Sequence, residues 1–463
     1  MFDEIEHSLL NYDNEAEEGQ KHVIYKKLLL QLTYLFVELI NKGFTKQYLY
    51  NLFQVIFIYK NEPEWTFEGR YQDWKNLRDR VKENYTIIFK IIGNEFQIAQ
   101  LKKIDSAYNP IEKKERKDFN KIVSDRVKNF LKENKLGKLV AIEVSAHDHL
   151  KALEMARERI SRDLDLYHLG LNNHVFAIDI QAAIIGENHP DKSSTAPVNY
   201  QIDGYVNRNL IAFDRLLVKI EKIKANNIDE DSYDKFFSAI RYLRTGSESP
   251  ELETKLLNYW IGLEYIFTSN NSEGKTIDRI RKFYPICHAL VYAKRNLYDF
   301  HKSVERHNLE NAIPNFSDNL EYLVLHKSYN DIINQTNNEL LKFRAQYFQK
   351  WVENPSNISI MLKKHTDNVK WNLTRLYRIR NEIVHNAAIK NGIYVNISHM
   401  KYYLIFILNS ILDFMANDPS DADNNGKVTI EDYFIAQDIM LGSLKGNTVK
   451  NFLNVKFPRQ ILH

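Results

Sequence analysis

The stretch MLKKHTDNVKWNLTRLYRIRNEIV, residues 361–384, sets the expectation for the second half of the chain. It contains no glycine and no proline, so nothing in it interrupts a helix. Its apolar residues recur at intervals of three and four, which places them on one helix face: Leu373, Leu376, Ile383 and Val384. We therefore expect a long amphipathic helix that packs against other helices.

Three polar residues follow at the end of this helix. Arg380 lies seven residues after Leu373, within the apolar stripe, where a cation needs a partner or a wet cleft because burying a lone charge is costly. Asn381 and His385 are four residues apart and stack on one flank. Arginine can hold two phosphate oxygens, and histidine can transfer protons near neutral pH. This set suits cleavage of RNA without a metal, in which a ribose 2′-hydroxyl attacks the neighbouring phosphate.

Helix geometry adds a condition to this chemistry. Five residues of a helix turn by a net angle of about 140° and rise about 7.5 Å, so Arg380 and His385 of one straight helix do not aim at one point. Two copies of the helix that face each other across a twofold axis would bring them together. We therefore expect a homodimer with a composite site and RNA as its substrate.

The pattern R-N-x-x-x-H, Arg380 to His385, resembles the R-x(4–6)-H motif of HEPN-domain proteins. Residues 256–267, LLNYWIGLEYIF, resemble the W-x-x-L-E-x-L-F helix of the Apea-like HEPN branch, which is found in bacterial and phage-defence ribonucleases. Residues 236–242 and 247–249 also resemble that branch. The resemblance covers roughly residues 205–416, under half of the chain.

The resemblance implies a C-terminal HEPN-like helical bundle with Arg380 and His385 as catalytic residues and Asn381 as a supporting polar residue. It also implies a metal-independent endoribonuclease that leaves a cyclic phosphate and a 5′-hydroxyl, as a phage-defence or toxin-like effector. Inactive HEPN domains provide the alternative: a non-catalytic scaffold that dimerises and binds nucleic acid or nucleotides.

Glu264 is the expected partner of Arg380. It follows Ile261 by three residues and Leu257 by seven, so it also sits on an apolar face. Two opposite charges on two apolar faces predict a contact between the helices with a buried ion pair. Such a pair is either structural alone, or it orients Arg380 for a phosphate.

Composition predicts a mainly α protein. The chain has 463 residues, enough for two to four domains, and its 15 glycines and 10 prolines indicate long regular elements. We expect an α-helical N-terminal region over 1–135, a small mixed α/β unit over 136–200, a HEPN-like helical domain over 201–416 and a C-terminal extension over 417–463.

The mixed unit is expected to contain a strand–helix–strand sequence. Residues 139–144 and 175–180 predict strands, and residues 148–166 predict a helix. A metal could be bound by residues of the kinds found at 147–149, namely His147, Asp148 and His149. Asp148 stands directly before an apolar helix, however, and is better explained as the N-cap of that helix.

Charge and cysteine content exclude several classes of protein. The formal net charge is +3, so any contact with RNA must be a local patch. Cys287 is the sole cysteine, which excludes an intrachain disulfide and a cysteine-based zinc site. Residues 402–414 are apolar but too short to span a membrane, and the first residues lack the basic start of a secretory leader. We therefore expect a cytoplasmic protein with no membrane partner.

Residues 421–432, DADNNGKVTIED, match the order of a calcium-binding loop. Gly426 supplies the turn at position six, and the ligand positions one, three, five and twelve are Asp421, Asp423, Asn425 and Asp432. Aspartate in place of glutamate at position twelve predicts a weakened structural Ca²⁺ site. Metal-independent cleavage needs no cofactor, so none is expected for catalysis. The alternatives are a turn that caps the next helix and, for the whole protein, a calcium-regulated interaction protein.

Overall fold

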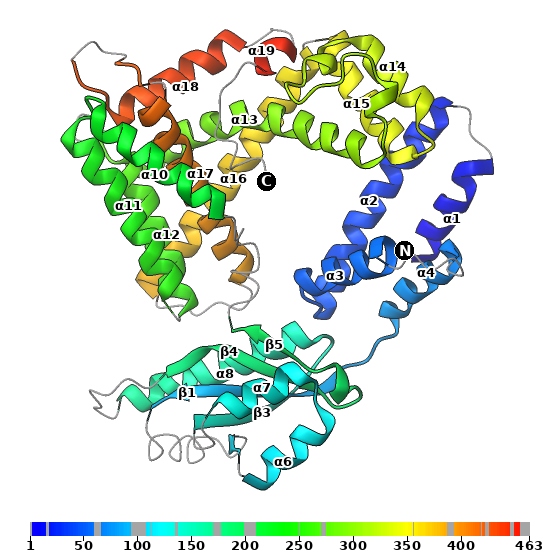
Figure 1. Ribbon diagram of the computed structural model, residues 1–463, viewed down its shortest axis with the longest axis vertical. Coiled ribbons are helices and arrows are strands. Elements are labelled where there is room, and N and C mark those ends of the chain that lie inside the picture. Colours follow the sequence, from blue (N-terminus) through cyan, green and yellow to red (C-terminus); the bar gives the residue numbers. More distant parts are fainter. Residues whose placement is uncertain are drawn as a thin grey trace. The chain divides into compact units, whose positions relative to one another are not determined.

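The computed structural model in Figure 1 shows a mainly α-helical protein with one small antiparallel sheet. It consists of two compact units, Met1–Tyr205 and Val206–His463. The structure describes residues 2–14, 18–59, 66–93, 108–111, 113–134, 138–169, 177–198, 210–249, 251–269, 275–354, 356–386, 393–417, 419–421, 426–444 and 449–453.

The first unit begins with a group of helices around Trp74. The elements are α1 (Phe2–Asn14), α2 (Glu18–Lys42), α3 (Lys46–Phe53), a π-helical turn (Gln54–Tyr59), α4 (Phe67–Lys75) and a 3₁₀ turn (Asn76–Arg78). The Trp74 indole is buried, and rings from several of these elements pack on it at centroid distances of 5.3–6.2 Å: Phe2, Phe36, Phe53, Phe57 and Tyr71. Edge-to-face packing of this kind lets large side chains fill a small core densely.

A five-stranded sheet follows in the same unit. Its strands are β1 (Glu83–Ile92), β2 (Asn109–Pro110), β3 (Leu139–Ala146), β4 (Ala177–Gly186) and β5 (Ser194–Pro197), in the spatial order β2-β3-β1-β4-β5. All pairs are antiparallel, and the register places Ile87 opposite Ile142 on one side and Ile184 on the other.

Helices cover both faces of this sheet. Ile87 and Phe89 pack with α8 (His149–Leu169), whereas Ile88 points to the opposite face and packs with α7 (Asp125–Glu133). The helix α6 (Lys113–Ile122) contacts α7. Because side chains alternate along a strand, β1 needs apolar residues on both faces.

The expectation of a purely helical N-terminal region is wrong for Glu83–Ile92, which forms the central strand. Its run of β-branched and aromatic residues does not alternate with polar ones, because both faces are buried, and such a run is not distinguishable from a buried helix by period alone. The predicted boundary at 135/136 therefore falls inside one compact unit. The strand at 139–144 and the helix at 148–166 are confirmed; for the strand at 175–180, β4 begins at Ala177, and residues 175 and 176 lie outside the described part.

The interpretation of Asp148 as an N-cap is confirmed. Its fully buried carboxylate accepts hydrogen bonds from the backbone N–H groups of Leu150, at 2.9 Å, and Lys151, at 2.8 Å. It also accepts from the backbone N–H of Thr45, at 2.7 Å, and the Thr45 hydroxyl itself caps α3 through Tyr48. One carboxylate therefore fixes the starts of α3 and α8 together.

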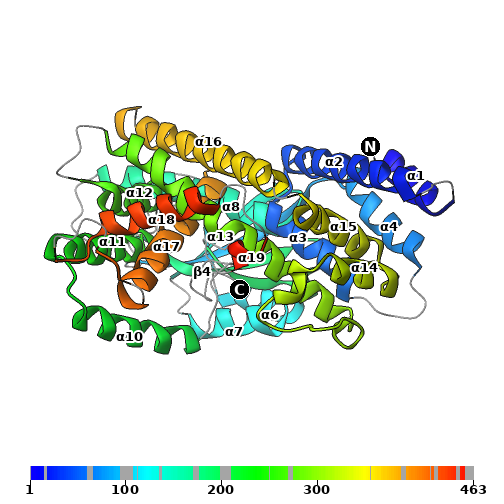
Figure 2. The same ribbon diagram turned by 90° about the horizontal axis from the view of Figure 1, so that it is seen from above.

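The second unit is helical throughout its described residues. Its elements are α10 (Leu210–Ala225), α11 (Glu230–Glu248), α12 (Leu252–Phe267), α13 (Thr276–Arg306), two 3₁₀ turns (Glu310–Ala312 and Glu321–Val324), α14 (His326–Gln335), α15 (Glu339–Glu353), α16 (Ser356–Asn386), α17 (Tyr394–Asn417), α18 (Ile430–Leu444) and α19 (Val449–Leu453). The helix α16 is visible along its length in Figure 2.

Two layers of contacts organise this unit. The helices α13 and α16, of 31 residues each, pack on one another, and α12 packs against α11 and α17. Gly262 of α12 permits the close approach, because a Cβ there would lie 3.0 Å from Leu404 and 3.2 Å from the carbonyl oxygen of Ala239. The segment predicted as a separate extension belongs to this unit, since α18 packs on α13.

A pair of imidazoles joins α13 and α16. The Nδ1 atom of His288 lies 2.7 Å from Nε2 of His365, whose ring stacks on Tyr292 at 3.7 Å. Burial lowers the pKa of His288 to about 3 and the pKa of His365 to about 4, and the neighbouring Arg295 guanidinium adds to the effect on His288. Both imidazoles are therefore neutral at pH 7 and share one N–H···N hydrogen bond.

We predict that acid destabilises the second unit through this pair. The folded-state pKa values lie below the unfolded value of about 6.5, so the contribution is present above pH 6.5 and is lost as the pH falls toward 4. Between pH 7.5 and pH 5 we expect a loss of about 1–3 kcal/mol in the free energy of unfolding, measured by urea denaturation. The variant His365→Gln should lose less over the same interval; an identical pH dependence in both proteins would contradict the assignment.

Candidate functional site

The helix predicted at 361–384 is confirmed as the greater part of α16. Leu373 and Leu376 are fully buried and Ile383 is 9% exposed, as the apolar stripe predicts. Val384 is 48% exposed and does not belong to the buried face. The stripe therefore ends at Ile383, and the last turn of the helix faces outward.

The predicted contact between Arg380 and Glu264 is present. The Nη2 atom of Arg380 lies 3.8 Å from Oε2 of Glu264, which α12 contributes, and the two side chains are 25% and 26% exposed. The pair is thus half-buried and loosely joined, because 3.8 Å exceeds the distance of a hydrogen bond. A half-buried pair of this kind holds the guanidinium in position without sealing it from a ligand.

Asn381 has a role that the sequence did not show. Its Oδ1 atom accepts a hydrogen bond of 3.0 Å from Nη1 of Arg380, and among the described residues no hydrogen bond joins Asn381 to His385. Within the described part of the chain, the bond to Asn381 is the single hydrogen bond of the Arg380 guanidinium, which has five N–H groups. The remaining N–H groups are free to bind an oxyanion.

His385 is exposed in the last turn of α16. Arg380 points toward α12, whereas His385 faces outward, so one chain does not bring the two side chains together. This arrangement agrees with the helix geometry expected from their separation of five residues.

The α12 helix packs against α16 near Arg380. Leu256, Trp260 and Leu263 are fully buried, and the Trp260 ring lies 5.7 Å from the ring of Tyr377, one turn before Arg380. Glu264 follows Trp260 by one turn. The residues that carry the resemblance to the Apea-like helix thus form the packing surface of the Arg380 contact.

An exposed face of α16 was not predicted from the sequence. Trp371 is 77% exposed, and Arg375 and Arg378 are exposed four and seven residues later, with His385 a further two turns on. These intervals place all four on one side of the helix. Within the described residues neither arginine has a carboxylate partner, so the face is cationic and carries a flat ring.

A cavity of about 400 Å³ lies beside Glu264. Asp231, Asp234 and Glu264 line it, with Lys235 paired to Asp231 at 2.6 Å. Three carboxylates against one cation repel a phosphate but accept hydrogen bonds from amino groups, such as those of nucleobases. The cavity therefore suits amino groups of a ligand, whereas the Arg380 guanidinium suits its phosphate oxygens.

Comparisons with protein-family models, with curated proteins and with solved structures found no match. The resemblance to HEPN proteins therefore remains a prediction from the residues quoted above. None of the helices described is both long and apolar enough to cross a membrane.

Of the predicted calcium loop, residues 421–432, the structure describes residue 421 and residues 426–432. Asp423 and Asn425 lie outside the described residues. Asp421 accepts a hydrogen bond of 2.6 Å from the backbone N–H of Gly426, which has a φ of +87°. Gly426 therefore has the left-handed backbone conformation that favours glycine.

Asp432 caps α18. It is 1% exposed, and its Oδ2 atom accepts from the backbone N–H and the hydroxyl of Thr429, both at 2.7 Å. The backbone N–H of Asp432 donates back to the Thr429 hydroxyl at 3.1 Å. This reciprocal capping box supports the alternative of a capping turn for this end of the segment.

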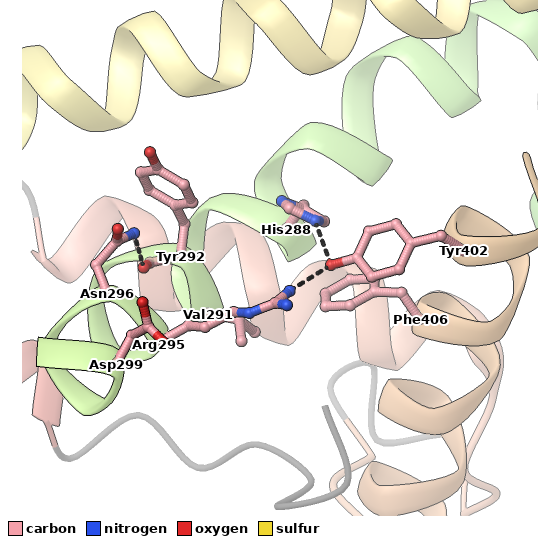
Figure 3. A pocket seen from close by; sticks show the side chains of 8 residues that line it. All are labelled: His288, Val291, Tyr292, Arg295, Asn296, Asp299, Tyr402 and Phe406. Atoms are coloured by element: carbon pink, nitrogen blue, oxygen red, sulfur yellow. Dashed lines mark hydrogen bonds between the residues drawn. The ribbon is translucent and has the colours of Figure 1, made fainter. Parts of the chain in front are cut away.

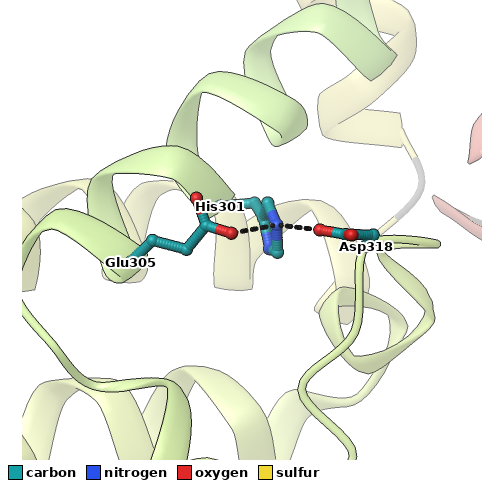
Figure 4. A group of neighbouring side chains, drawn as sticks. All are labelled: His301, Glu305 and Asp318. Atoms are coloured by element: carbon teal, nitrogen blue, oxygen red, sulfur yellow. Dashed lines mark hydrogen bonds and ion pairs between the residues drawn. The ribbon is translucent and has the colours of Figure 1, made fainter.

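His301, Glu305 and Asp318 form a second group whose donor atoms lie within 4.8 Å of one another, and these could hold a metal (Figure 4). Nε2 of buried His301 lies 3.3 Å from Glu305 and 3.4 Å from Asp318, and its Nδ1 lies 3.1 Å from the Tyr322 hydroxyl. Lys302 also pairs with Glu305, at 2.8 Å. These contacts satisfy the polar groups without an ion. We therefore interpret the cluster as a set of structural hydrogen bonds and ion pairs that join α13 to the segment after it.

We predict that Asp432→Ala lowers the free energy of unfolding by about 0.5–2 kcal/mol, because two donors at the start of α18 lose their acceptor. The loss should be the same in chelator and in millimolar calcium, as measured by urea denaturation. Asp438→Ala, on the exposed side of the same helix, is the matched control. A calcium-dependent rise in the melting temperature that Asp432→Ala abolishes would instead support the metal-binding prediction.

Proposed function

We propose that the protein is a metal-independent endoribonuclease of the HEPN type, active as a homodimer. The observation that supports this most directly is Arg380, a half-buried guanidinium with free N–H groups, on the same helix as the exposed imidazole of His385. We also propose a cytoplasmic location and a role as a phage-defence or toxin-like effector, both of which follow from the resemblance.

The chemistry assigns one role to each side chain. The 2′-oxygen of the RNA attacks the adjacent phosphorus, and the bond from phosphorus to the 5′-oxygen breaks. The imidazole of His385 takes the proton of the 2′-hydroxyl, and a water molecule protonates the leaving 5′-oxygen. The Arg380 guanidinium donates to the phosphate oxygens as negative charge builds. The products are a cyclic phosphate and a 5′-hydroxyl.

Asn381 and Glu264 act as positioning residues in this proposal. The 3.0 Å hydrogen bond from Arg380 to Asn381 and the ion pair with Glu264 hold the guanidinium plane from two sides. A guanidinium fixed before the substrate arrives loses less side-chain entropy on binding.

The exposed face of α16 supports the dimer and the RNA contact. Trp371 and Val384 are large apolar side chains left in solvent, and Arg375 and Arg378 lie on the face that bears His385. A second copy of α16 set against this face would cover Trp371. The arginines would then contact the phosphates that flank the cleavage site.

The alternative is a non-catalytic scaffold that dimerises and binds nucleic acid or nucleotides. The Glu264–Arg380 pair favours it in one respect, because such a pair also stabilises a helix contact with no catalytic role. The two functions differ in whether bound RNA is cut.

We predict that the purified protein cleaves mixed cellular RNA in chelator and leaves cyclic-phosphate ends. Arg380→Ala should reduce the rate by about 10²–10³-fold and His385→Ala by about 10²–10⁴-fold, because each removes transition-state stabilisation or proton transfer. Glu264→Gln should reduce it less. Arg244→Ala and His326→Ala, at exposed positions elsewhere in the second unit, are matched controls. RNA that stays intact but bound would support the scaffold, and equal cleavage by all variants would contradict the assignment.

Mixing the two inactive variants tests whether the site is composite. A heterodimer of Arg380→Ala and His385→Ala chains contains one site with both residues intact if each site draws Arg380 and His385 from different copies. Random exchange should then restore about one quarter of the wild-type activity. No recovery after verified exchange would rule out the composite site.

A further inference from the structure

A second polar pocket lies between α13 and α17, within the helical unit (Figure 3). Its volume is about 230 Å³. Polar side chains line one part, namely His288, Arg295, Asn296 and Tyr402, and the rings of Tyr292 and Phe406 line another. This volume is below the value of about 300 Å³ at which sites for drug-sized ligands begin, so the pocket suits a ligand smaller than a typical drug.

Arg295 is the one cation in the lining of this pocket, and it has no carboxylate partner among the described residues. Its Nη1 atom donates to the Tyr402 hydroxyl at 2.8 Å, and its guanidinium carbon lies 5.9 Å from the Tyr402 ring centre. Asp299 also lines the pocket, but its carboxylate pairs with Arg344 at 3.5 Å. The guanidinium is therefore a partly buried charge without a counter-ion, which is an unfavourable state that a bound anion relieves.

The hydroxyl group of Tyr402 is the second hydrogen-bond donor that we assign to this pocket. The guanidinium can only donate to the hydroxyl oxygen, and Nε2 of His288 lies 3.1 Å from the same oxygen. With the proton of His288 on Nε2, the hydroxyl oxygen accepts twice, and its O–H group is free to donate into the pocket. This arrangement requires Nδ1 of His288 to accept from the Nε2–H group of His365.

Donors thus reach the pocket from two helices. Arg295 and Asn296 are neighbours on α13 and Tyr402 comes from α17, so their donors approach from different directions. One N–H of the Asn296 amide donates to the carbonyl of Tyr292, which leaves its second N–H for a ligand. A phosphate monoester offers three acceptor oxygens to these three donors, whereas a carboxylate offers two.

We propose that this pocket binds a phosphate group, either as free phosphate or as the phosphate of a mononucleotide. Arg295 is the charge anchor, and Tyr402 and Asn296 supply further hydrogen bonds. Tyr292 and Phe406 offer flat surfaces to whatever group the phosphate carries. The proposal stands independently of RNA cleavage at Arg380.

Calorimetry and thermal melting of the full chain test the site, with inorganic phosphate, adenosine 5′-monophosphate and adenosine as probes at constant ionic strength. We expect phosphate to raise the melting temperature and to bind in calorimetry. Arg295→Met should abolish binding, and Arg295→Lys should weaken it, because lysine keeps the charge but not the fork. Arg306→Met, at an exposed position on the same helix, should bind like the wild type.

The comparison of probes identifies the source of the phosphate. Binding of the monophosphate at least tenfold tighter than that of phosphate, with none for adenosine, supports a mononucleotide, and equal affinities support free phosphate. Absence of binding by either anion, or unchanged binding in Arg295→Met, overturns the proposal. If Arg295→Met does not fold, Tyr402→Phe decides instead: binding weakened about tenfold supports the site, and unchanged binding overturns it.

Discussion

The contact between α13 and α16 is the constraint on which the helical unit depends. Both helices have 31 residues, and the neutral imidazole pair His288–His365 joins them at one position along their length. Because α16 is held along α13, its C-terminal turns meet α12 at Glu264. The position of Arg380 is therefore a consequence of packing that begins far from it in the sequence.

The helix geometry separates the two side chains that the chemistry would combine. Arg380 turns toward the neighbouring helix, where Glu264 and Asn381 hold it, and His385 turns toward solvent. A single helix cannot present both to one phosphodiester. Catalysis by this pair would for that reason need an assembly of chains, as we propose.

Several features of the fold were predictable from local patterns. The apolar period over 361–384 predicted α16, and opposite charges on two apolar faces predicted the contact of Glu264 with Arg380. An acidic residue before an apolar helix predicted the cap at Asp148. These predictions succeed because each rests on residues close in sequence, or on a charge that needs a partner.

Other features depend on tertiary structure that a local pattern does not contain. The strand β1 was missed because both of its faces are buried, which removes the alternation that marks a strand. His288 and His365 are 77 residues apart, and neither stands in a motif. The hydrogen bond from Arg380 to Asn381 joins sequence neighbours, but it depends on side-chain rotamers that a sequence pattern does not specify.

The length of α16 has a mechanical consequence. His365 and Arg380 are separated by fifteen residues of one helix, which corresponds to about 22 Å. A helix of this length is stiff, so its two ends move together. A tilt of about three degrees at the His365 end would displace the guanidinium by about 1 Å, a distance at which oxyanion contacts are gained or lost. His365, which contacts the pocket residue His288, and Arg380 therefore lie on one continuous helix.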